Sequence, residues 1–153
     1  MVTADVGLLV LRLVTGAIFA GHGVQKLFGW FGGPGLRGFA GMLEQAKVRH
    51  NRFWAVVVAL VETLGGLLLM AGLLTPFATA ALAVDMLVAI ALVHWRNGFW
   101  ITKGGAEYAL SLLVASAIFG LTRGGRYALD RVFGEGYADW SVALFVIAAV
   151  VGL

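Results

Sequence analysis

The sequence predicts an all-α integral membrane protein, a four-helix transmembrane bundle in which residues 140–153 are a candidate fifth membrane-embedded helix. The chain is 61% hydrophobic and only 12% charged, with a mean hydropathy of +0.94. A soluble domain carries about 25% charged residues, and a chain of 153 residues is too small to hide this apolar excess in its own core. We therefore expect lipid to be the solvent of one membrane domain, residues 1–153.

Apolar runs separated by glycine, proline and basic residues predict the individual spans. They lie at about residues 6–24, 53–74, 77–94 and 107–122. The second and third runs are divided by Thr75-Pro76, which predicts a tight turn without charge. The tail Trp140–Leu153 holds 14 apolar residues, which is short for a span, so a surface-lying segment is the alternative.

The polar interval between the first two spans has two parts. In the stretch Phe28–Gly35, glycines and Pro34 do not propagate a helix well, so we expect an aromatic loop at the membrane surface. In Leu36–His50, apolar residues recur at helical spacing among charged ones. This pattern favours a short amphipathic helix lying in the interface, and a plain solvated helix explains it equally well.

Composition and charge exclude several classes of protein. The chain has no cysteine, which excludes thiolate catalysis and cysteine-ligated metal or iron–sulfur clusters. The pI near 9.7 does not indicate nucleic acid, because the basic residues flank apolar runs instead of forming one stripe. Seven Lys and Arg residues fall on one side of the predicted spans and three on the other. The positive-inside rule therefore predicts that the N-terminus lies outside.

Three ionisable residues fall inside predicted spans, where charge is costly and each is a functional hypothesis. Arg12 and Asp85 lie about 9 and 12 Å from the same membrane face at 1.5 Å per residue. We therefore predict an Arg12–Asp85 ion pair, which can serve only to hold the helices in register. Glu62 lies about 18 Å from that face without an obvious partner at its depth, and it is a candidate proton acceptor.

Further polar residues are predicted to converge at the other membrane face. By the same counting, His22 and His94 lie about 24 and 26 Å along their helices, and Glu107 begins the fourth helix on that side. Imidazoles beside carboxylates suit proton transfer, so His22, Glu62, His94 and Glu107 are the catalytic candidates. The candidates for binding a flat ligand are Gln25, Lys26, Trp30, Trp100 and Tyr108. Snorkelling explains Lys26, and interface anchoring explains Trp30 and Trp100, at least as well as ligand binding, and no ligand spacing supports a metal site.

Several motifs in this order resemble the DoxX family of small bacterial and archaeal membrane proteins. The matching segments are Arg12, Gly21–Gly35, Glu62 with Leu64–Gly66, Leu73–Pro76, Asp85-Met86, His94–Tyr108 and Arg126–Asp130. The family is read as a four-helix bundle and is similar to the DoxD subunit of thiosulfate:quinone oxidoreductase. The resemblance implies a bacterial or archaeal cytoplasmic membrane, a quinone as ligand, and a redox partner protein or larger membrane complex.

Three hypotheses of function follow from these features. The first is a membrane subunit of a redox system that interacts with a quinone. The second is a non-catalytic assembly or anchoring subunit, in which the intramembrane charges only hold the packing. The third is a small proton-coupled transporter that uses Glu62 and Asp85, although the sequence shows no inverted repeat.

Overall fold

The computed structural model describes residues 2–132, and their regular structure is helical without strands. The main helices are α1 (Val2–Phe28), α2 (Gly35–Gln45), α3 (Asn51–Ala71), α4 (Thr75–Ala89) and α5 (Glu107–Leu121). Within residues 2–132, three helices are long and apolar enough to cross a membrane, when α4 is counted through to Asn97, and α5 is a shorter apolar helix. This confirms the all-α membrane bundle, whereas the candidate fifth helix at 140–153 lies outside the described residues.

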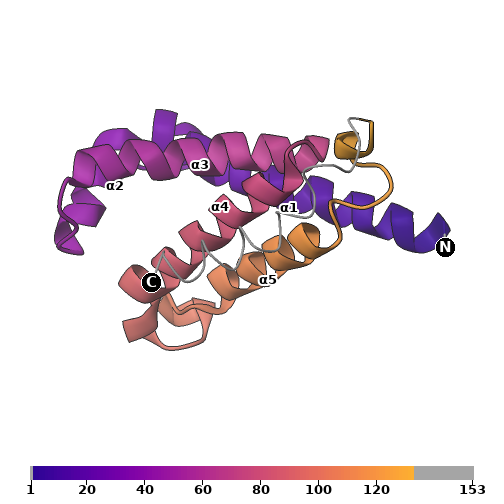
Figure 1. Cartoon of the computed structure of the whole chain (residues 1–153). Coiled ribbons are helices and arrows are strands. Elements are labelled where there is room, and N and C mark those ends of the chain that lie inside the picture. The colour runs from indigo at the N-terminus through magenta and orange to yellow at the C-terminus, as the bar shows by residue number, and fades with distance from the viewer. Residues whose placement is uncertain (1, 133–153) are drawn as a thin grey trace.

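The four long helices are arranged as two crossing pairs. Figure 1 shows α1 lying along α3, and α4 lying beside α5, with the second pair running obliquely to the first. The core between them contains the fully buried side chains of Phe19, Leu69, Leu82 and Phe119. Large apolar side chains on the outer faces of these helices remain exposed, which is the pattern expected where lipid replaces water.

Small residues allow α1 and α3 to pack closely. A Cβ atom at Gly66 would lie 2.6 Å from the carbonyl oxygen of Gly16, and one at Gly23 would collide with Thr63. Helices in membranes pack through such small residues, because apolar burial alone does not favour helix contact over lipid contact. α1 therefore continues through Gly21 and Gly23 to Phe28, four residues beyond the expected end.

The glycine-aromatic stretch forms a turn that leads into α2. Gly29 and Gly32 have φ of 73° and 76°, and Phe31 between them has φ of 54° in the short helix η1 (Trp30–Gly32). α2 then packs Ala40 and Leu43 against Ala55 of α3. The predicted loop and the predicted helix within 36–50 are both present, and the depth of α2 in the membrane stays a prediction.

The opposite end of the bundle is closed by the segment after α5. Gly72 follows the last residue of α3 and caps the helix with φ of 65°, and a side chain there would collide with Arg12 and Ala128. Asp130, in the short helix η5 (Leu129–Arg131), accepts hydrogen bonds from the backbone N–H groups of Leu74 at 2.7 Å and Thr75 at 2.8 Å. This carboxylate therefore caps the start of α4.

The connection from α4 to α5 is an irregular helical hairpin. α4 continues as the π-helix η2 (Ile90–His94), followed by the short helices η3 (Trp95–Asn97) and η4 (Ile101–Lys103). Backbone bonds from Ala106 to Gly98 and from Glu107 to Phe99 close this hairpin. The π-helix is a wide turn with i→i+5 hydrogen bonds, a feature that occurs frequently at functional sites.

Candidate functional site

A cavity of about 290 Å³ lies within the helix bundle, bounded mostly by apolar side chains. Its polar lining comes from α1, α3, α4, η2 and α5, and consists of His22, Lys26, Glu62, Asp85, His94 and Tyr108. Apolar walls with a few convergent polar groups characterise sites for small organic ligands. The structure thus brings together five of the predicted site residues and adds Asp85 to them.

An ion pair between Lys26 of α1 and Glu62 of α3 forms part of the cavity lining. The Glu62 side chain is 3% exposed and that of Lys26 is 20% exposed. The Lys26 ammonium also lies 5.1 Å from the centre of the Phe39 ring of α2, within the range of a cation–π interaction. Glu62 therefore has a partner, contrary to our expectation from helix depth.

Asp85 of α4 lies at the same cavity and interacts electrostatically with Glu62 and Lys26. Its Oδ2 atom is buried and has no hydrogen-bond partner among the described residues. Buried polar atoms are almost always satisfied by hydrogen bonds, so an unsatisfied carboxyl oxygen at a cavity is available to form a hydrogen bond with a ligand.

Two histidines face the cavity with different partners. The Nε2 atom of His22 lies 3.1 Å from the Tyr108 hydroxyl. Nδ1 of His94 lies 2.8 Å from the carbonyl oxygen of Gly104. A carbonyl only accepts, so His94 donates from Nδ1 in this bond, and Nε2 remains available to a ligand.

One wall of the cavity is formed by α2. Phe39, Met42 and Leu43 of this helix line the cavity, together with Leu92 and Val93 of the π-helix. Met42, Leu92 and Val93 are 53%, 49% and 45% exposed. The cavity therefore borders the outer, lipid-facing surface between α2 and η2.

Four predicted site residues are not among those lining the cavity. Gln25 donates to the carbonyl oxygen of Phe31, and the Glu107 carboxylate accepts a 3.0 Å hydrogen bond from the backbone N–H of Ile101. Trp30 and Trp100 are 58% and 60% exposed and contact neighbouring aromatic rings. In these positions the four side chains order the two loops at this end of the bundle.

Arg12 and Asp85, which we expected to form an ion pair, have different partners in the structure. Arg12 is 2% exposed and donates hydrogen bonds to the carbonyl oxygens of Gly124 at 2.7 Å and Tyr127 at 3.0 Å. It also interacts electrostatically with Asp130. The expectation is wrong because counting residues gives the depth of a side chain and not the face of the helix from which it projects.

Sequence reasoning missed the roles of α2 and Asp130. Phe39, Met42 and Leu43 are spaced at i, i+3 and i+4, so they lie on one face of a helix. This spacing could have predicted that the face packs against the bundle. The segment Arg126–Asp130 was recognised only as a motif, and nothing in its spacing identifies Asp130 as the cap of a helix that begins 55 residues earlier.

These features define a class: a small helical membrane protein with a buried ion pair beside an apolar cavity. The chain belongs to the DoxX family, whose model matches residues 7–95. It is 32% identical over 139 residues to "Putative oxidoreductase CatD" of Bacillus subtilis, covering 91% of this chain and 96% of that protein. It is 34% identical over 134 residues to "Uncharacterized membrane protein Rv3486" of Mycobacterium tuberculosis, covering 80% of this chain and 78% of that one. No solved structure matches the chain significantly.

Proposed function

We propose that this protein is the quinone-binding membrane subunit of a redox system. The observation that carries the proposal is the apolar cavity of about 290 Å³ that contains the Lys26–Glu62 ion pair and the unsatisfied Asp85 oxygen. The oxidoreductase name of the Bacillus subtilis relative supports the same class of activity.

The chemistry of the lining fits a quinone head group. Lys26 and the His22–Tyr108 pair offer hydrogen-bond donors to a carbonyl oxygen, and the free Asp85 oxygen offers an acceptor to a hydroxyl. The volume is near the lower limit for ligand pockets, which suits a single ring. A hydrophobic tail would leave past Met42 and Leu92, at the exposed edge of the cavity.

A bound quinone would supply the quinone/quinol redox couple, in which the quinone takes up two electrons and two protons to form the quinol. In this proposal, His22, Glu62 and Asp85 hold and exchange the protons at the cavity, while α2 and the π-helix exclude water. The sequence has no cysteine to ligate an iron–sulfur cluster, so the electrons come from a partner protein that carries its own redox cofactor.

We place the protein in a cytoplasmic membrane with the N-terminus outside. The cavity end carries seven Lys and Arg residues, five within residues 26–52 and two within residues 95–106, whereas the segment after α5 carries three. The larger basic count favours the cytoplasmic side for the cavity end. The redox partner therefore approaches from the cytoplasm.

Binding of a short-tailed benzoquinone by the protein in mild detergent, measured by calorimetry, tests this proposal. We expect His22→Gln to weaken binding about tenfold, because it removes the imidazole paired with Tyr108. His50→Gln is the matched control, since His50 is exposed in the loop before α3. Equal affinities for the wild type and the His22 variant would contradict the assignment of the cavity as the quinone site.

A further inference from the structure

A second cavity, a cleft of about 560 Å³, lies between α2 and the beginning of α3. It is lined by Leu36, Arg37, Ala40, Gly41, Glu44, Asn51, Arg52 and Val56. None of these residues lines the bundle cavity. The cleft is therefore a separate site that the proposed redox function does not use.

The face that α2 turns to the cleft combines a depression with opposite charges at its two ends. Arg37, Ala40, Gly41 and Glu44 recur at i, i+3, i+4 and i+7, so they form one face of the helix. Open space lies where a Gly41 side chain would extend. The depression at Ala40 and Gly41 is thus flanked by a guanidinium on one side and a carboxylate on the other.

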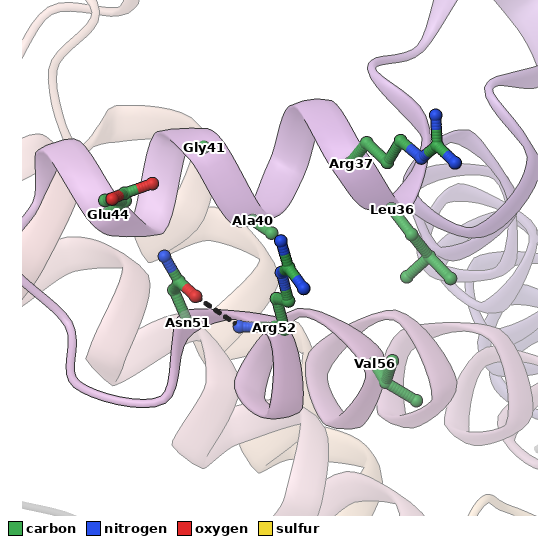
Figure 2. Close-up of a pocket in the computed structure, with 8 residues that line it drawn as sticks. All are labelled: Leu36, Arg37, Ala40, Gly41, Glu44, Asn51, Arg52 and Val56. Carbon is green, nitrogen blue, oxygen red and sulfur yellow. Dashed lines mark hydrogen bonds between the residues drawn. The ribbon is translucent and has the colours of Figure 1, made fainter.

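The beginning of α3 contributes a second cation. Figure 2 shows Arg52 and Asn51 extending from α3 toward α2, whereas the Arg37 guanidinium extends from α2 away from α3; all three residues line the cleft. Within residues 2–132, neither Arg37 nor Arg52 forms an ion pair. Two cations from different helices at the same cleft can therefore bind an anion without first breaking an existing pair.

The surroundings of the cleft indicate the source of that anion. Phe53 and Trp54 next to Arg52 are 61% and 46% exposed, as is typical of residues at a membrane interface. Leu36 and Val56 give the cleft an apolar border that can contact acyl chains. A ligand that matches this combination has a phosphate next to a hydrocarbon chain, which is the chemistry of a phospholipid.

We propose that this cleft binds the head group of phosphatidylethanolamine. Arg52 binds the phosphate and Arg37 adds a second positive charge at the same cleft. Glu44 binds the primary ammonium, which keeps N–H donors that choline lacks. Glu44 repels a head group that is only anionic, so it discriminates against phosphatidylglycerol. The proposal does not depend on the quinone site.

Native mass spectrometry of the full chain, with lipids of identical acyl chains, tests this assignment. The wild type should retain phosphatidylethanolamine over phosphatidylglycerol and phosphatidylcholine. Arg52→Gln should reduce this retention about tenfold, and Gly41→Leu should reduce it by filling the depression. Arg49→Gln is the matched control, because Arg49 is exposed nearby and does not line the cleft.

Glu44→Gln separates head groups: it should abolish the preference for phosphatidylethanolamine while retention of phosphatidylglycerol rises. Equal losses in the Arg49 and Arg52 variants would show diffuse surface charge and overturn the site. An unchanged lipid preference in Glu44→Gln would overturn the head-group assignment. Displacement of the lipid by millimolar inorganic phosphate would show a simple anion site and overturn the proposal as well.

Discussion

Two groups of charged side chains lie within the helices of this bundle, and their surroundings differ. At one end, Arg12 and Asp130 bind backbone groups of the segments that close the bundle. Around the cavity, Lys26, Glu62 and Asp85 interact mainly with one another. Among the described residues, each group has one buried side-chain atom without a hydrogen-bond partner, Arg12 Nε and Asp85 Oδ2, but only Asp85 lines the cavity.

This difference separates charges that hold the fold from charges that are available to a ligand. Arg12 satisfies carbonyl oxygens more than 110 residues away in sequence, so it ties the beginning of α1 to the segment after α5. Lys26 and Glu62 also join two helices, but they do so beside an apolar cavity. Substitutions at the two ends should therefore separate stability from binding.

The largest effect is expected for Arg12→Met, which keeps most of the side-chain volume. It leaves the carbonyl oxygens of Gly124 and Tyr127 and the Asp130 carboxylate without the cation, so the free energy of unfolding should fall by about 4 kcal/mol. Unfolding in mixed micelles, followed by circular dichroism, measures the loss. Arg126→Met, at a side chain that is 65% exposed, should lower stability by less than about 1 kcal/mol.

A smaller effect is expected for Lys26→Met, because part of this side chain remains exposed. Removal of the ammonium leaves Glu62 buried without its partner and should cost about 3 kcal/mol. The double variant Lys26→Met/Glu62→Gln should recover most of that loss and still fail to bind the quinone. If the double variant bound the quinone as tightly as the wild type, the ion pair would have only a structural role. Lys103→Met is the control for the loss of a surface cation.

The smallest effects come from the same change at two aspartates. Asp130→Asn removes the charge of the helix cap and should destabilise the protein by about 1 kcal/mol. Asp85→Asn removes a carboxyl group beside Glu62. This change should stabilise the protein by about 1 kcal/mol and weaken quinone binding. Unfolding and calorimetry on both variants check these opposite signs. A loss of stability in both variants would contradict the distinction between charges that hold the fold and charges available to a ligand. Asp5→Asn is the control for the loss of a carboxylate at the surface.

Hydropathy was sufficient to predict the helices, because a span must be long and apolar whatever it contacts. The ends of the helices depended on contacts that hydropathy does not contain. Gly23 continues α1 because it packs against Thr63, and α4 begins at Thr75 because Asp130 caps it. The predicted domain, residues 1–153, and the candidate fifth helix stay predictions.

The cavity lining was predicted in part, because helix depth places residues along one axis only. His22 and His94, which were assigned to one level of the bundle, both line the same cavity. Asp85 was paired with the wrong partner, since depth counting omits the rotation of each helix. Lys26 was assigned to the mouth, yet its long side chain reaches the buried Glu62.

The 11-residue helix α2 has one face on the bundle cavity and another on the cleft between α2 and α3. A displacement of α2 therefore changes the shape of both cavities at once. By thermodynamic linkage, if occupancy of one cavity changes the affinity of the other, the reverse effect has the same magnitude. Measuring quinone affinity as the membrane lipid is varied thus reports on the coupling free energy across a single helix.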